Sequence, residues 1–175
     1  MQLLRELLPN AARFGVLADP AYPDAASFIA DLQAAARTLG LQLIIVYART
    51  DGELEPAFAR FSQQRVGAVL VTNSAFYNRR IEQLAALATR HALPAIYPLR
   101  EYALAGGLMS YGISLGYAYP QVGIYTGRIL KGDKPADLPV QQITKIDLVI
   151  NLKTANALGL TIPETLLATA DEVIQ

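Results

Sequence analysis

The sequence predicts an α/β fold, an open parallel sheet with helices on both faces. Short apolar segments alternate along the chain with longer segments in which apolar residues recur at helical spacing. The apolar segments, such as Leu43-Ile44-Ile45-Val46, run without polar alternation. That pattern is typical of strands covered on both sides in a parallel sheet. We therefore expect a Rossmann-like or flavodoxin-like topology with right-handed crossovers.

The first hundred residues give the clearest succession of strands and helices. Phe28 and Leu32 lie at helical spacing, and Gly40 follows where a helix C-cap glycine belongs. Leu54 and Phe58 share one face of the next helix. Strands are expected at 14–17, 41–47, 68–71 and 95–97, and helices at 28–39, 53–64, 78–91 and 100–105.

The pattern changes near residue 105. The sequence predicts a short strand at 108–110, a helix at 117–131 with Pro120 in its first turn, and a loop at 131–139. A strand at 146–150, a short helix at 154–158 closed by Gly159, and a terminal helix at 163–174 follow. We expect three parts: a ligand-binding lobe (1–112), a crossover helix and loop (113–145), and a strand with helices that returns to the lobe (146–175).

Composition excludes several classes of function. Fifteen basic and fifteen acidic residues cancel, so nothing favours nucleic acid or an anionic membrane as partner. No apolar run approaches the roughly 18 residues of a membrane span. The absence of cysteine excludes disulfides, thiolate metal sites and cysteine nucleophiles. The residues after Met1 lack the features of an export signal, so no signal peptide is expected in this sequence.

A ligand is expected beyond the carboxyl ends of the strands, where open α/β sheets bind small molecules. Five tyrosines and one phenylalanine fall in the segments that this geometry selects: Tyr22, Phe76, Tyr77, Tyr97, Tyr102 and Tyr111. Short polar side chains accompany them and suit the polar end of a small organic ligand: Asp19, Asn73, Ser74 and Ser110. The alternative is that the tyrosines only cap the sheet edge.

The known motifs of cofactor binding and catalysis are missing. ADPAYPDA follows the first strand in place of G-x-G-x-x-G, and neither a phosphate-binding loop nor G-x-S-x-G occurs. The single histidine, His91, is expected at a helix end away from the strand ends, and no cluster has metal-ligand spacing. We predict no cofactor, no metal and no catalytic residue. Arg100 lies in the rim and either grips a carboxylate ligand or is a solvated residue at a helix start.

Three long segments carry a family resemblance: LLRELLPNAARFGVLADPAYP, HALPAIYPLREYALAGGLMSYG and ILKGDKPADLPVQQITKIDLVINLKTANALGLTIPETLLATADEVI. They resemble the substrate-binding proteins of ABC transporters related to the tryptophan/tyrosine uptake group. The resemblance implies a type I periplasmic-binding-protein fold, in which two lobes close on a solute. Only the second half of such a protein is matched.

The ligand-contacting role of the family transfers best to Ser110, Tyr111 and Gly112. It transfers less well to Asn73 and Ser74, where the family tends to have proline-aspartate. It transfers weakly to Asp19, where the family tends to have asparagine. With Tyr22 and Tyr97 from the strand-end argument, these residues are the predicted ligand-binding set.

The resemblance implies a solute-binding component of an ABC transporter, not an enzyme, that takes a small aromatic or amino-acid-like solute. It also implies permease and ATPase partners and a periplasmic or lipid-anchored extracytoplasmic location. The apolar face of 117–131 must be buried, so we expect a homodimer or an exchanged arm to cover it. The alternatives are a stand-alone sensory or regulatory domain, and a hydrolase or transferase restricted to Asp19, Ser74, Glu101 and Ser110.

Overall fold

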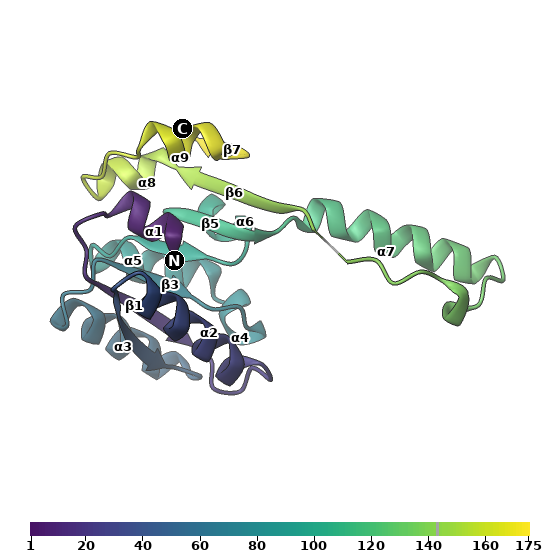
Figure 1. Ribbon diagram of the computed structural model, residues 1–175, viewed down its shortest axis with the longest axis horizontal. Coiled ribbons are helices and arrows are strands. Elements are labelled where there is room, and N and C mark those ends of the chain that lie inside the picture. The colour runs from purple at the N-terminus through teal and green to yellow at the C-terminus, as the bar shows by residue number, and fades with distance from the viewer. Residues whose placement is uncertain (143) are drawn as a thin grey trace.

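Seven strands form one sheet in the order β2-β1-β3-β4-β5-β6-β7 in the computed structural model, which describes residues 1–142 and 144–175 (Figure 1). The strands are β1 (Arg13–Ala18), β2 (Gln42–Tyr47), β3 (Ala68–Val71), β4 (Ala95–Tyr97), β5 (Met109–Ile113), β6 (Ile146–Asn151) and β7 (Glu172–Ile174). Neighbouring strands are parallel except β5 and β6, which are antiparallel. The predicted α/β class is confirmed, and the return of the chain at β6 adds one antiparallel pair.

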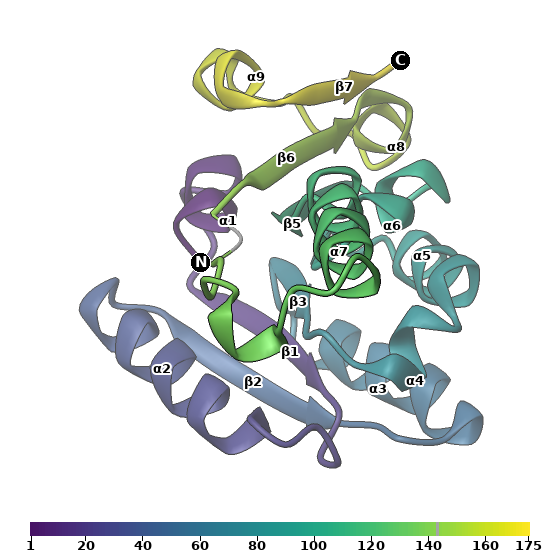
Figure 2. The same ribbon diagram turned by 90° about the vertical axis from the view of Figure 1, so that its right-hand side faces the viewer.

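Helices cover both faces of the sheet (Figure 2). One side carries α1 (Gln2–Leu7), α2 (Ala25–Thr38) and α9 (Glu164–Thr169), and the other α3 (Asp51–Gln63), α4 (Ala75–Asn78), α5 (Ile81–Arg90), α6 (Arg100–Leu104) and α8 (Leu152–Ala157). The larger core lies under α3, α5 and α6, where Phe58 and Phe61 pack on Leu17 and Val69. A smaller cluster beneath α2 joins Ile29 and Leu32 to Val16.

The apolar pattern accounts for the two long helices of the lobe. In α2 the buried residues are Ile29, Leu32 and Ala36, which recur at three and four residues along one face. In α3 the buried residues Leu54, Phe58 and Phe61 do the same. Glu53 reaches back to accept a hydrogen bond from the backbone N–H of Thr50 at 3.0 Å, which fixes the start of α3.

Four local predictions need correction. The helix expected at 78–91 is divided, because the hydroxyl of Ser74 caps the short α4 and α5 begins only at Ile81. Pro120 lies in the second turn of α7, which begins earlier than expected. The strand expected at 108–110 extends to Ile113. The terminal helix expected at 163–174 ends at Thr169, and β7 follows it.

Helix α7 (Leu115–Leu130) and the chain that returns from it form an arm that projects from the sheet (Figure 1). The returning chain includes one 3₁₀ turn, η1 (Pro135–Asp137). This arm falls within the predicted crossover segment 113–145, of which residue 143 lies outside the described residues. Of the residues of α7, only Ala118 is buried. Within the described residues, no helix combines the length and the apolar character that a membrane crossing needs.

Candidate functional site

The loop after β1 is held by a local hydrogen bond. Asp19 is buried, and its Oδ1 accepts a hydrogen bond from the backbone N–H of Ala21 at 2.9 Å. This Asx turn, which includes Pro20, fixes the direction of the chain between β1 and α2. Tyr22 follows on the surface with 37% of its area exposed. The loop therefore exposes a tyrosine ring, while one oxygen of the buried Asp19 carboxylate is engaged in the turn.

The loop after β3 presents an amide and uses its serine structurally. Asn73 is exposed, and its Oδ1 accepts from the Asn78 side chain at 3.0 Å. Ser74 is buried, and its Oγ accepts from the backbone N–H of Tyr77 at 3.1 Å as the cap of α4. Asn73 is therefore available to a ligand at this edge, whereas Ser74 is engaged in shaping the loop.

Three of the rim tyrosines pack inside the protein. Tyr77, Tyr97 and Tyr102 are fully buried, and the rings of the last two stack with centroids 4.6 Å apart. Tyr77 donates its hydroxyl hydrogen to the carbonyl of Ala48 at 2.8 Å. Burial raises the pKa of all three phenols above their usual range. Tyr97 borders the groove described below, but its ring belongs to the core beneath α5 and α6.

The segment Ser110-Tyr111-Gly112 is strand β5, so its side chains alternate between the two faces. Tyr111 is exposed and lines the groove. Ser110 is fully buried, and its Oγ has no hydrogen-bond partner among the described residues. A Cβ on Gly112 would lie 1.8 Å from the carbonyl oxygen of Pro98. These three residues therefore differ in role: a displayed ring, a buried hydroxyl and a close backbone approach.

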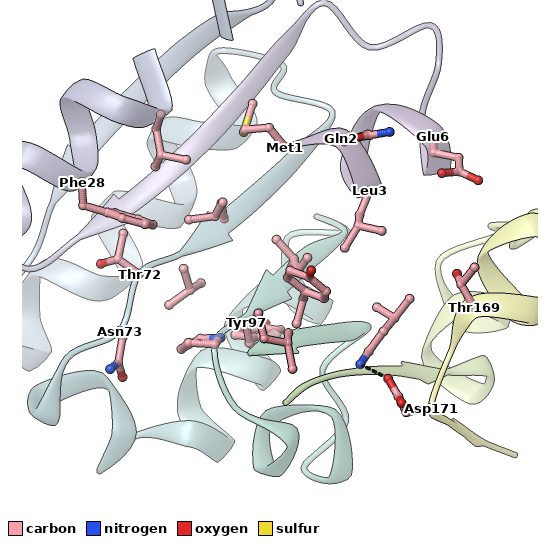
Figure 3. Close-up of a pocket in the computed structure, with 18 residues that line it drawn as sticks. Met1, Gln2, Leu3, Glu6, Phe28, Thr72, Asn73, Tyr97, Thr169 and Asp171 are labelled. Atoms are coloured by element: carbon pink, nitrogen blue, oxygen red, sulfur yellow. Dashed lines mark hydrogen bonds between the residues drawn. The ribbon is translucent and has the colours of Figure 1, made fainter. Parts of the chain in front are cut away.

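A groove of about 870 Å³ runs over the sheet face between α2 and α1 (Figure 3). Its floor is largely apolar, from Leu70, Ile96 and Leu148, and Thr72 and Asn73 lie at one end. Phe28, Tyr22 and these two polar residues also enclose an adjoining pocket of about 110 Å³. Sequence reasoning missed Phe28 and Thr72 as site residues. Thr72 could have been predicted from the sequence, because it directly follows β3. Phe28 could not, because its place beside the pocket depends on how α2 packs on the sheet.

Charged groups near the edge are already paired. Arg100 begins α6, as one of the two alternatives predicted, and its guanidinium binds both carboxylate oxygens of Glu172 at 2.6 and 2.7 Å. Arg80 pairs with Asp51 and lies over the ring of Phe76. His91 follows α5 at the opposite edge, where its Nε2 lies 2.9 Å from Glu55. Across residues 1–142 and 144–175, no three His, Asp or Glu side chains are grouped to hold a metal ion.

The family model for ABC transporter substrate-binding proteins matches residues 1–174. A conserved domain protein from Vibrio cholerae O1 biovar El Tor is 28% identical, with a TM-score of 0.87 over 98% of this chain and 58% of that one. The ABC domain in complex with L-Trp from Streptococcus pneumonia is 26% identical, with a TM-score of 0.86 over 99% and 60%.

A ligand-free, open substrate-binding protein with adhesive properties from Clostridium difficile has the same fold. It is 20% identical, with a TM-score of 0.72 over 99% of this chain and 58% of that chain. Among curated proteins, none matches the chain. The chain thus spans about three fifths of the length of each of these three structures, with nearly all of its own residues aligned.

Proposed function

Because the chain belongs to the family of ABC transporter substrate-binding proteins, we propose that its strand-end edge forms one wall of a cleft that closes on a small solute. The pocket beside Tyr22 and Phe28, of about 110 Å³, carries this proposal. Ligand pockets usually measure about 300–1,000 Å³, so this pocket suits one part of a solute and leaves the rest to an opposite wall. The binding itself involves no chemical step.

The wall suits the aromatic part of an amino-acid-like solute. Exposed rings at Tyr22 and Tyr111 offer apolar faces with a hydroxyl at the tip, and Asn73 offers an amide. Arg80 and Arg100 are occupied by carboxylates of the chain itself, so neither of them is free to hold a solute carboxylate. A solute carboxylate is therefore expected to bind elsewhere. The L-Trp complex of the similar pneumococcal domain supports an aromatic amino acid as the first solute to test.

The predicted ligand-binding residues do not contribute equally to this proposal. Tyr22, Asn73 and Tyr111 touch the solute. Asp19 and Ser74 shape the loops, and Gly112 lets β4 and β5 approach. Tyr97 packs beneath the wall, where Ser110 is also buried. From the family, we propose a permease and an ATPase of an ABC transporter as partners of this chain. We also propose an extracytoplasmic location for the chain itself. A second copy of the chain is the further partner that we propose, to cover α7.

Calorimetric titration with L-Trp, L-Tyr and L-Phe tests the solute. We expect binding that weakens about fivefold or more in Tyr22→Ala and in Tyr111→Ala, since a lost aromatic contact costs about 1 kcal/mol. Tyr47→Ala is the matched control, because Tyr47 is an exposed tyrosine at the end of the outer strand β2. Heat of binding that is absent for all three amino acids, or equal losses in all three variants, contradicts the aromatic wall.

A further inference from the structure

Asn73 offers a side-chain amide to the solute, and the orientation of that amide decides which chemical group it can bind. Asn73 is exposed after β3 and lines both the groove and the small pocket beside Tyr22 and Phe28 (Figure 3). A side-chain amide donates hydrogen bonds from its nitrogen and accepts them at its oxygen. Thr72 lines the same two cavities, but its hydroxyl can donate or accept and therefore selects neither kind of group.

A buried tyrosine determines the orientation of the neighbouring amide, that of Asn78. Tyr102 is fully buried, and burial raises the pKa of its phenol, so the hydroxyl keeps its hydrogen. The hydrogen of a buried hydroxyl needs an acceptor. Among the described residues, the acceptor that it reaches is Oδ1 of Asn78, at 3.2 Å. The opposite orientation of Asn78 would turn its Nδ2 toward the phenol and leave the phenol hydrogen without an acceptor, which is costly for a buried group.

The orientation of Asn78 in turn fixes that of Asn73. With its Oδ1 toward Tyr102, Asn78 donates from its Nδ2 to Oδ1 of Asn73 at 3.0 Å. The oxygen of Asn73 therefore faces Asn78, and its Nδ2, which carries two hydrogens, makes no hydrogen bond within the described residues. Both hydrogen bonds of this series lie inside the lobe, so they hold whatever lies across the cleft.

The charges of the groove leave Asn73 to set the polarity at its own end. The charged side chains that line the groove, Glu6 and Asp171, lie at the end away from Asn73 (Figure 3). The carboxylate of Asp19 is buried after β1 and lines neither cavity. Beside Asn73 the two cavities are therefore lined by uncharged side chains, with the amide as the polar group of fixed direction.

We propose that Asn73 acts at this site as a hydrogen-bond donor, held in that orientation by Asn78 and Tyr102. The solute then presents an oxygen acceptor to Asn73, a carboxylate or a carbonyl, beside the pocket at Tyr22 that takes its aromatic part. Asn78 and Tyr102 are positioning residues, since they act on the solute through Asn73. This inference rests on the solute wall proposed above and adds the polarity of one of its contacts.

Two indole probes test the polarity by calorimetric titration: indole-3-propionate, which has a carboxylate and no amine, and tryptamine, which has an amine and no carboxylate. We expect indole-3-propionate to bind about tenfold more tightly, because hydrogen bonds to a charged acceptor are strong and the amide offers no acceptor to the ammonium group. Asn73→Ala should remove most of this preference by weakening the acid alone. Asn156→Ala, on the exposed surface of α8, is the control and should leave it unchanged. A preference for tryptamine, or one for the acid that survives Asn73→Ala, overturns the donor role.

Tyr102→Phe tests the positioning role, because it removes the hydrogen that fixes Asn78 and so lets Asn73 turn. The acid should weaken by no more than about twofold, since about half of the molecules keep the donor orientation. Tryptamine should bind about fivefold more tightly, because Oδ1 of Asn73 becomes available to its ammonium group. Damage to the fold would not strengthen the binding of one probe. Tyr77→Phe is the control, because the hydroxyl of Tyr77 donates to the carbonyl of Ala48, and both affinities should stay unchanged. Equal weakening of both probes by Tyr102→Phe overturns the positioning role.

Hydrogen exchange of the side-chain amides, followed by NMR without any solute, tests the orientation directly. The amide hydrogens of Asn78 should exchange slowly and those of Asn73 fast, because only the former donate within the protein. Slow exchange at Asn73 overturns the orientation. Binding of L-Trp without discrimination between the two indole probes overturns the donor role and leaves the cleft wall intact. Absence of binding by L-Trp and by both probes overturns the cleft wall and this selectivity together.

Discussion

Gly112 shows how one residue sets the spacing of two strands. Its position opposite Pro98 leaves no room for a side chain, because a Cβ would lie 1.8 Å from the Pro98 carbonyl oxygen. The contact involves backbone on both sides, so no side-chain rotation relieves it. Strands β4 and β5 can therefore approach at the carboxyl edge only with glycine at this position, next to Tyr111, the exposed ring of the proposed wall.

Gly112→Ala is accordingly expected to lower the free energy of unfolding by about 1–3 kcal/mol, as other forced overpacking does. Gly123→Ala is the matched control. A Cβ there meets nothing within 4 Å, and alanine in a helix interior is favoured over glycine by about 1 kcal/mol. Urea midpoints should move in opposite directions for the two variants. An unchanged midpoint for Gly112→Ala would mean that β4 and β5 are further apart than described.

At the scale of helices and strands, the junction of β6 and α8 depends on one buried side-chain amide, that of Asn151. Asn151 donates from its Nδ2 to the carbonyl of Ala103 at 2.9 Å and accepts at its Oδ1 from the backbone N–H of Thr154 at 3.1 Å. The first bond joins β6 to α6, and the second caps α8. A single side chain therefore joins the adjacent β6 and α8 to α6, which is far from them in sequence.

Asn151→Ala should cost about 2–4 kcal/mol, the sum of a lost cap and an unpaired buried carbonyl. Asn151→Asp retains the acceptor of the cap, but it places a buried carboxylate oxygen against the Ala103 carbonyl, so it should also be less stable than the wild type. Ser114 is the control, because it precedes α7 without a side-chain capping bond, and Ser114→Ala should change stability by less than about 0.5 kcal/mol. Equal urea midpoints for Asn151→Ala and Ser114→Ala would contradict this role.

Elements defined by local pattern were predictable, and those defined by distant pairing were not. The buried face of α3 is visible in the spacing of Leu54 and Phe58, because a helix repeats within a few residues. Strand β7 was predicted as the end of a helix, because its three residues become a strand only by pairing with β6. Tyr97 and Tyr102 were predicted at the rim, but both are buried, and that burial depends on helices that the local sequence pattern does not place.

At the scale of the whole molecule, the three buried tyrosines predict alkaline unfolding. Burial raises the pKa of Tyr77, Tyr97 and Tyr102, so each stays neutral in the folded protein above pH about 10, where an unfolded chain ionises. The unfolded state then binds fewer protons, and the free energy of unfolding falls as pH rises, by up to about 1.4 kcal/mol per pH unit for each tyrosine. Below that pH their contribution is fully present.

Urea midpoints measured on either side of pH about 10 should show this fall, with tyrosinate absorbance rising in step with unfolding. Tyr97→Phe removes one of the three titrating phenols, so it should make the fall less steep. The hydroxyl loses only a 3.5 Å contact to the carbonyl of Leu84, so the substitution itself should cost little stability. The exposed Tyr47 offers the control, and Tyr47→Phe should leave the slope as in the wild type. Tyrosinate absorbance that is complete before unfolding begins would refute the burial of these phenols.

The ladder between β5 and β6 has one more consequence. Ile113, where the arm leaves, and Ile146, where it returns, are direct partners in an antiparallel pair. The two ends of a long excursion are thus already at the spacing that a β-hairpin requires. A two-residue turn such as Asn-Gly matches that geometry. The excursion is therefore a replaceable cassette, and joining its ends by such a turn would leave all seven strands and their order unchanged.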